Sequence, residues 1–127
     1  MKAKQNVDKT MVTKAVITKI QGDFKPQFIK AQHVNDYNDP DTIYVKGSKT
    51  EKGYKPDIIA SKGEQINIYE IELDDKLPVT KWRFFSNYAR EHNGEFYIVV
   101  PDYLKEDVKK EIQDKDIYSG LIYFKTR

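Results

Sequence analysis

The sequence predicts an α/β domain in which helices flank a central mixed β-sheet, and three kinds of pattern support this fold class. Apolar residues recur at helical spacing over about 8–20 and 77–93. The segment 55–73 has the alternation and turn residues of a β-hairpin. Residues 94–101 form a continuous apolar run, as expected for a strand covered on both faces. A single domain spanning 1–127 accounts for the length of the chain.

Local signals between these elements predict the rest of the fold. Gly22 is expected to end the first helix. Residues 23–46 mix short apolar stretches with turn-forming Asn, Asp and Pro, which predicts one or two short strands. The segment 46–55 has two glycines and four lysines against one Glu, and predicts a mobile basic loop. Asp102 is expected to cap a third helix, and residues 117–124 to form the last strand.

Composition excludes several classes of protein and of site. The chain has no cysteine, which excludes disulfides and thiolate zinc sites and agrees with a cytoplasmic location. No apolar run is long enough to cross a membrane, and no apolar stretch follows the first lysines as in a secretory leader. The net charge is only +2, but residues 1–20 carry five lysines and one acid, so one end could face phosphates.

The predicted hairpin concentrates acidic residues at one of its ends. Strand residues two apart share a face, so Glu70 and Glu72 project together with Ile66 and Ile68. Pairing of the two strands brings Asp57 within reach of Glu70, and we expect the three acids to converge. Such crowded carboxylates raise one another's pKa, and a bound cation offsets this cost. Their hard oxygen ligands favour Mg²⁺, Mn²⁺ or Ca²⁺.

These residues resemble the motif of the PD-(D/E)XK nucleases, a family that includes restriction endonucleases and Holliday junction resolvases. Pro56-Asp57 is similar to the PD element, and Glu70-Ile71-Glu72 to (D/E)-X-K with Glu in the lysine position. The segment KWRFFSNYAREHNGEFYIVVP, residues 81–101, is similar to the helix and strand that follow this motif. The resemblance implies a restriction-endonuclease-like core.

The resemblance also implies roles for individual residues. Asp57 and Glu70 would ligate Mg²⁺ or Mn²⁺ together with the main-chain carbonyl of Ile71. Glu72 takes the place of the lysine that orients or activates the attacking water, and Lys81 is the candidate for a lysine moved to the next helix. The implied activity is hydrolysis of DNA phosphodiester bonds, and a homodimer would be needed to cut both strands of a duplex at once.

Basic residues of the predicted loop are the candidate DNA contacts, namely Lys49, Lys52 and Lys55. The alternative is that these lysines are simply solvated. Pro40-Asp41 is a rival for the PD element, and Asp8 is a candidate for an extra acid on the first helix. His33 and His92 are isolated in the sequence and are interpreted as surface or turn residues. Because Glu72 replaces the usual lysine, a non-catalytic module for DNA binding or assembly remains the alternative function.

Overall fold

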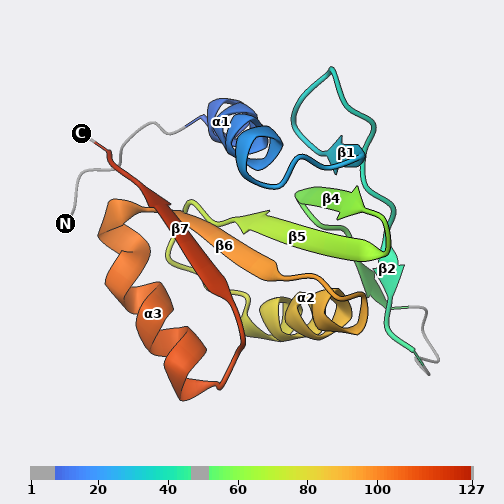
Figure 1. Ribbon diagram of the computed structural model, residues 1–127. Coiled ribbons are helices and arrows are strands. Elements are labelled where there is room, and N and C mark those ends of the chain that lie inside the picture. Colours follow the sequence, from blue (N-terminus) through green and yellow to red (C-terminus); the bar gives the residue numbers. More distant parts are fainter. Residues whose placement is uncertain (1–7, 47–51, 127) are drawn as a thin grey trace.

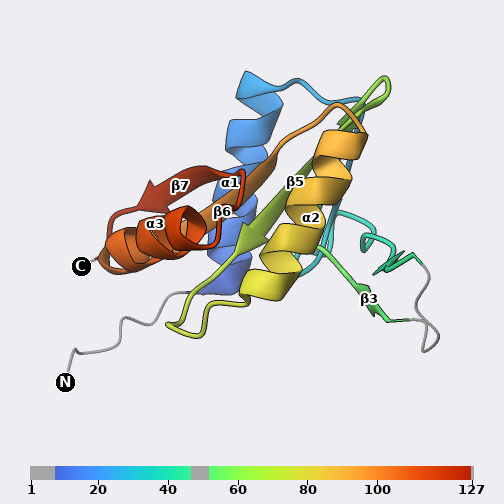
Figure 2. The ribbon, with the colours of Figure 1, turned by 90° about the horizontal axis from the view of Figure 1, so that it is seen from below.

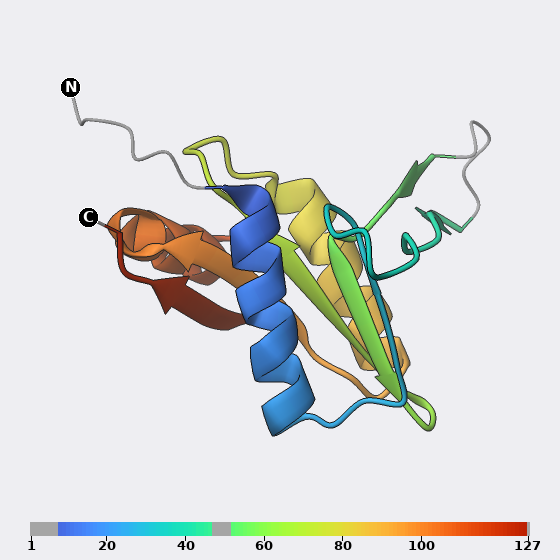
Figure 3. The same ribbon diagram turned by 90° about the horizontal axis from the view of Figure 1, so that it is seen from above.

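The computed structural model describes residues 8–46 and 52–126, and it has a central sheet with helices on both faces (Figure 1). In chain order the elements are α1 (Lys9–Asp23), β1 (Phe28–Ala31), β2 (Ile43–Tyr44), β3 (Gly53–Tyr54), β4 (Ile58–Lys62), β5 (Gln65–Ile71), α2 (Val79–Glu91), β6 (Phe96–Pro101), the 3₁₀ turn η1 (Asp102–Leu104), α3 (Lys105–Asp114) and β7 (Gly120–Phe124). Helix α1 covers one face of the sheet, and α2 and α3 cover the other (Figure 2 and Figure 3). The predicted α/β class with a mixed sheet and flanking helices is confirmed.

The main sheet has five strands in the order β1-β4-β5-β6-β7. The pairs β1–β4 and β4–β5 are antiparallel, whereas β5–β6 and β6–β7 are parallel. The register of the β4–β5 hairpin pairs Ile58 with Tyr69. Extending this register by one residue sets Asp57 opposite Glu70, at the end of the hairpin away from its turn. The sheet therefore brings the two predicted acids to neighbouring positions.

Alternation along β5 divides the core into two clusters. Tyr69 and Ile71 pack with α1, in a cluster that includes Val16 and Ile20 of that helix. Ile68 points the other way and packs with Trp82 of α2. By the same alternation Glu70 lies on the α2 face, as predicted from its spacing to Ile68. A charged side chain thus occupies a core position of the central strand.

Helix α2 packs on the end of β5 because its apolar residues share one face. Trp82, Phe85 and Ala89 are fully buried, which confirms the predicted helix. After the helix the chain passes very close to β5: a Cβ added to Gly94 would lie 1.6 Å from the main-chain oxygen of Ile66. Only glycine fits there. This packing sets the first turn of α2, which carries Lys81, beside the carboxyl end of β5.

Two helix boundaries differ from the prediction. Helix α1 continues through Gly22 to Asp23, since nothing obstructs a helical glycine at this exposed position. Asp102 does not cap α3, because its Oδ1 accepts a hydrogen bond from Thr126 Oγ1 (2.9 Å) and the 3₁₀ turn η1 comes first. Helix α3 then begins without a side-chain cap.

The predicted basic loop over 46–55 is partly a strand. Gly53 and Tyr54 form β3, which pairs antiparallel with β2 beside the main sheet. The Tyr54 ring packs on that of Phe84, with 5.3 Å between centroids, and this contact anchors the pair to α2. Residues 47–51 lie outside the described part of the chain. Among the helices of the described residues, none has the length and apolar character needed to cross a membrane.

Candidate functional site

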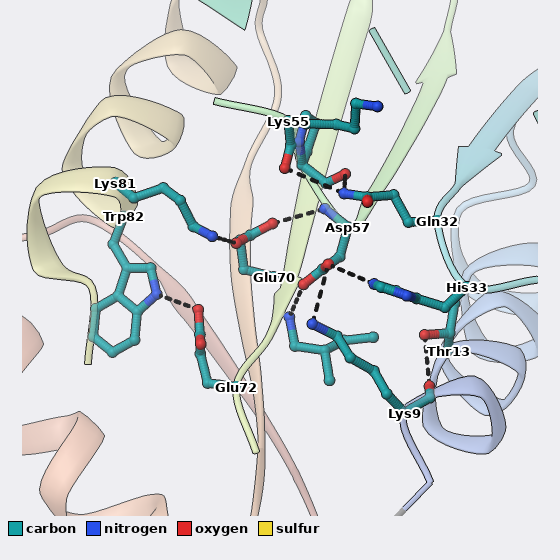
Figure 4. Close-up of polar contacts among 12 residues, drawn as sticks. Lys9, Thr13, Gln32, His33, Lys55, Asp57, Glu70, Glu72, Lys81 and Trp82 are labelled. Carbon is teal, nitrogen blue, oxygen red and sulfur yellow. Dashed lines mark hydrogen bonds and ion pairs between the residues drawn. The ribbon is translucent and has the colours of Figure 1, made fainter. Parts of the chain in front are cut away.

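Asp57 and Glu70 are joined by hydrogen bonds where β4 begins and β5 ends (Figure 4). The Asp57 N–H donates to Glu70 Oε2 (2.7 Å), and the Ile71 N–H donates to Asp57 Oδ2 (2.8 Å). Both side chains are buried, and Glu70 is completely shielded from solvent. The predicted proximity of these two acids is confirmed. Each carboxylate accepts a main-chain N–H from the opposite strand, which holds both in place.

Lys81 joins the pair from the first turn of α2. Its Nζ lies 2.8 Å from Glu70 Oε1, and its side chain remains partly exposed. The neighbouring Trp82 is buried in the core, so the helix is rotated with Lys81 toward the end of β5. The lysine that was expected on this helix does therefore reach the acids.

Glu72 does not converge with Asp57 and Glu70, contrary to the prediction. Its Oε2 accepts a hydrogen bond from the indole Nε1–H of Trp82 (3.0 Å), a donor that needs a partner because the ring is buried. Within 8–46 and 52–126 no three His, Asp or Glu side chains are grouped so as to hold a metal ion. The predicted cluster of three acids is therefore reduced to a pair.

The chain bends at Asp57, and the bend directs its carboxylate away from Glu70. Regular alternation would point both side chains to the α2 face. Instead, Asp57 Oδ1 lies 3.3 Å from Lys9 Nζ of α1, while Glu70 turns to Lys81 of α2 (Figure 4). The two carboxylates are adjacent through the Asp57 main chain but contact different helices.

His33 and Lys9 are site residues that the sequence interpretation missed. His33 is exposed at a bend, as interpreted from the sequence, but it is not isolated, because its Nε2 lies 3.3 Å from Asp57 Oδ1. The segment next to it is tied to Asp57, because the Gln32 N–H donates to the Asp57 main-chain oxygen (2.9 Å). Neither residue carries a local signal, since α1 and the segment after β1 meet Asp57 only through tertiary packing.

Burial and neighbouring charges shift the pKa values of the site. Burial, aided by the Asp57 charge and opposed by Lys81, raises the pKa of Glu70 from 4.5 to about 7. Burial also raises the pKa of Glu72, against the effect of the Trp82 hydrogen bond. Partial burial lowers the pKa of Lys81, but the Glu70 and Glu72 carboxylates outweigh it and the net pKa is raised. Lys81 is therefore an ammonium ion at neutral pH.

The two carboxylates of the acid pair contact cations on different helices, and no group of metal-binding side chains is found among residues 8–46 and 52–126. Asp57 Oδ1 and Glu70 Oε1 contact side-chain cations, whereas the second oxygen of each acid is bound by a main-chain N–H. Mg²⁺ commonly takes one or two protein carboxylates and keeps several waters. Ile71 meets the pair through its N–H, and the role of its carbonyl as a ligand stays a prediction.

The candidate DNA-binding lysines are only partly described. Lys49 lies outside the described residues. Lys52 precedes β3, and its main-chain oxygen accepts a hydrogen bond from the Val45 N–H (2.7 Å). Lys55 Nζ lies 3.7 Å from Asp39 Oδ2, and both side chains are exposed. This salt bridge contributes little to stability, and DNA contact by these lysines stays a prediction.

The rival acids have other positions and partners. Asp8 is the N-cap of α1, where its carboxylate accepts a hydrogen bond from the Thr10 N–H (2.9 Å). Asp41 is almost fully exposed, and its Oδ2 lies 3.7 Å from Lys30 Nζ. His92 ends α2, and its Nδ1 lies 2.8 Å from the Tyr88 main-chain oxygen. Of Pro40-Asp41 and Pro56-Asp57, only the second lies beside a buried acid, Glu70.

No protein-family model, curated protein or solved structure matches this chain significantly. The likeness to PD-(D/E)XK nucleases therefore rests on the motif residues and their geometry.

Proposed function

We propose that the protein is a metal-dependent nuclease that hydrolyses phosphodiester bonds of DNA. One observation carries the proposal: Asp57 and Glu70 stand opposite each other across the hairpin, with Lys81 Nζ 2.8 Å from Glu70. An acid before one strand, an acid on the next and a lysine on the following helix match the PD-(D/E)XK pattern with a moved lysine. The order of a helix, an antiparallel hairpin and a parallel strand reached through a second helix supports a restriction-endonuclease-like core.

Asp57 and Glu70 are the side chains that would hold Mg²⁺ or Mn²⁺, with the Ile71 carbonyl as a further ligand. Such an ion acidifies water and neutralises negative charge on the phosphate. Lys81 is an ammonium ion, so it donates hydrogen bonds to a phosphate oxygen or to water and does not accept a proton. Glu72 is partly exposed and has a raised pKa, so it is the group that accepts a proton from the attacking water.

The test is cleavage of linear, branched and single-stranded DNA in Mg²⁺ or Mn²⁺. We expect D57A and E70Q each to slow cleavage at least about 100-fold, because each removes one charged oxygen ligand. K81M should retain metal binding but cleave slowly. D41A is the matched control, since it changes the rival sequence Pro40-Asp41 at an exposed position. This variant should cleave DNA at the normal rate. Absence of metal-dependent cleavage on all three substrates would contradict the proposal.

A second candidate is a non-catalytic module that uses this fold for DNA binding or assembly. It is favoured by Glu72 in the lysine position and by Lys9 and Lys81, which already balance the charges of Asp57 and Glu70. Calorimetric titration with Mn²⁺ separates the candidates. A nuclease should bind the ion through the acid pair and lose that binding in E70Q. Binding of equal strength in E70Q, together with DNA binding but no cleavage, would favour the module.

A further inference from the structure

Lys9 and His33 contact the site from the side opposite Lys81, and the proposed chemistry gives them no role. Both lie 3.3 Å from the same atom, Asp57 Oδ1. They come from different parts of the chain, since Lys9 begins α1 and His33 follows β1. Neither Lys9 nor His33 is needed to hold Asp57 in place. Its carboxylate oxygen Oδ2 accepts a hydrogen bond from the Ile71 N–H, and its main-chain oxygen accepts one from the Gln32 N–H.

The backbone of His33 has an unusual conformation for its place in the fold. Its φ is +72°, in the left-handed region. Three other non-glycine residues of the described chain have positive φ, and each follows the end of a helix, namely Lys25, Asn93 and Asp116. His33 instead lies in a bend two residues after β1, and histidine is among the residue types enriched in this conformation. The bend places its ring at Asp57.

The two cations are more accessible than the acid they contact. The side chains of Lys9 and His33 are 37% and 33% exposed, against 9% for Asp57. Their distances to Oδ1 exceed the roughly 2.7–2.9 Å of a tight charge-assisted hydrogen bond. A ligand that approaches Asp57 from solvent on the α1 side therefore meets an ammonium and an imidazole that are not firmly engaged.

The chemistry of the two side chains indicates what this ligand is. Lys9 and His33 present an ammonium group and an imidazole on the solvent side of Asp57. A phosphodiester carries a single negative charge, and its oxygens accept hydrogen bonds from both groups.

We propose that Lys9 and His33 bind a phosphate of the DNA backbone on the α1 side of Asp57, opposite Lys81. The inference rests on the proposed function and specifies how the substrate is held. The phosphodiester then lies between the ammonium group of Lys9, at the start of α1, and the imidazole of His33, after β1. Lys9 and His33 then contribute to substrate affinity, while Asp57 and Glu70 provide metal affinity.

The experiment measures DNA and metal binding separately for K9M and H33N. Methionine keeps the length of the Lys9 side chain, and asparagine tolerates the left-handed backbone at residue 33. K19M is the matched control, since it removes an exposed lysine from the same helix, where it pairs with Asp23. Affinity for fluorescein-labelled duplex and single-stranded DNA is measured in Ca²⁺ over a range of salt, with the DNA checked for integrity. Mn²⁺ affinity is measured by calorimetry without DNA.

We expect K9M to weaken DNA binding about tenfold and to lower the salt slope by about one, as for the loss of one phosphate contact. H33N should weaken binding about threefold, K9R should restore it, and K19M should match the wild type. Mn²⁺ affinity should not fall in K9M or H33N, because neither residue is a metal ligand. Circular dichroism verifies that each variant is folded.

Three outcomes would overturn the inference. K9M and H33N that bind DNA like K19M would exclude the phosphate contact while metal-dependent cleavage, and thus the proposed function, stands. Reduced Mn²⁺ affinity with unchanged DNA affinity would show that Lys9 and His33 only position Asp57. A wild-type protein that binds no Mn²⁺ would overturn the proposed function and this inference with it.

Discussion

Asn67 and Glu70 are two buried polar side chains on the same central strand, and they differ in where their partners come from. Asn67 Oδ1 accepts hydrogen bonds from the Glu95 N–H (2.9 Å) and from Gln65 Nε2 (3.3 Å). Both partners lie on β5 or just before β6. Glu70 instead contacts Asp57, before β4, and Lys81, on α2. The first group joins β5 to the segment before β6 through neutral groups, whereas the second joins β5 to the start of β4 and to α2 around a charge.

The comparison separates a polar residue that serves the fold from one that serves function. Asn67 is neutral, and its hydrogen bonds hold the tight passage at Gly94 against β5. Glu70 carries a charge in a position where an apolar residue of similar size would stabilise the fold equally well or better. Burial raises its pKa to about 7, which is a measure of this cost. A residue kept at such a cost is a candidate for function.

The largest expected effect on stability is a pH dependence that is dominated by Glu70, and the raised pKa of Glu72 adds to it in the same direction. The pKa of Glu70 rises from 4.5 in the unfolded chain to about 7 in the fold, so the folded protein binds more protons between these values. Its contribution to stability is complete below pH 4.5 and is lost as the pH rises through about 7. The loss amounts to about 3 kcal/mol of unfolding free energy. Urea denaturation in EDTA from pH 5 to 8 measures it.

E70Q is the control for this pH dependence, because glutamine does not titrate. Its unfolding free energy should fall much less than that of the wild type over the same range. N67A should keep the slope of the wild type, since Asn67 carries no charge. Parallel curves for wild type and E70Q would contradict the assignment of the raised pKa to Glu70.

A smaller loss of stability is expected from replacing Asn67. N67A leaves the partly buried Glu95 N–H without its acceptor, which costs about 1 kcal/mol of unfolding free energy. Thermal or urea denaturation measures this loss, and DNA cleavage by the folded variant should equal that of the wild type. If N67A abolished DNA cleavage while remaining folded, the assignment of Asn67 to the fold and of Glu70 to function would be wrong.

The smallest effect is expected at Tyr69, whose hydroxyl oxygen accepts a hydrogen bond from Asn67 Nδ2 at the long distance of 3.4 Å. Burial is the main cause that raises the pKa of Tyr69 to about 12, so the hydroxyl stays neutral at physiological pH. Y69F removes one weak bond between neutral groups and should cost less unfolding free energy than N67A. Urea denaturation of Y69F and of the double variant N67A/Y69F tests this. A cost equal to that of N67A would show that the hydroxyl is the main partner of Asn67.

Local periodicity predicted the positions of Asp57 and Glu70 in the hairpin. Residues two apart on a strand share a face, so Glu70 was expected beside Ile68, on the face opposite Tyr69 and Ile71. The turn at Gly63, where φ is +60°, sets a register that continues to Asp57 opposite Glu70. Helical spacing likewise predicted α2, the helix that carries Lys81. These relations depend on neighbours within one hairpin or one helix.

The other contacts of the site depend on tertiary packing, which no local pattern in the sequence encodes. Glu72 was expected to join the acid pair, but the indole N–H of Trp82 binds it because a buried donor needs an acceptor. The bend at Asp57 turned its carboxylate toward α1, where alternation predicted the opposite face. His33 reaches this carboxylate from a bend after β1.

Strand alternation and hairpin pairing predicted the acid pair from the sequence, because these patterns act over a few residues. The resemblance to the nuclease motif pointed to a lysine on the following helix. Tertiary structure alone decided which cation meets which carboxylate. Lys9, His33 and Lys81 come from three elements whose packing is set by the two apolar clusters, not by the charges themselves. Burial of these clusters is non-directional, and it brings charged groups together that are far apart in the sequence.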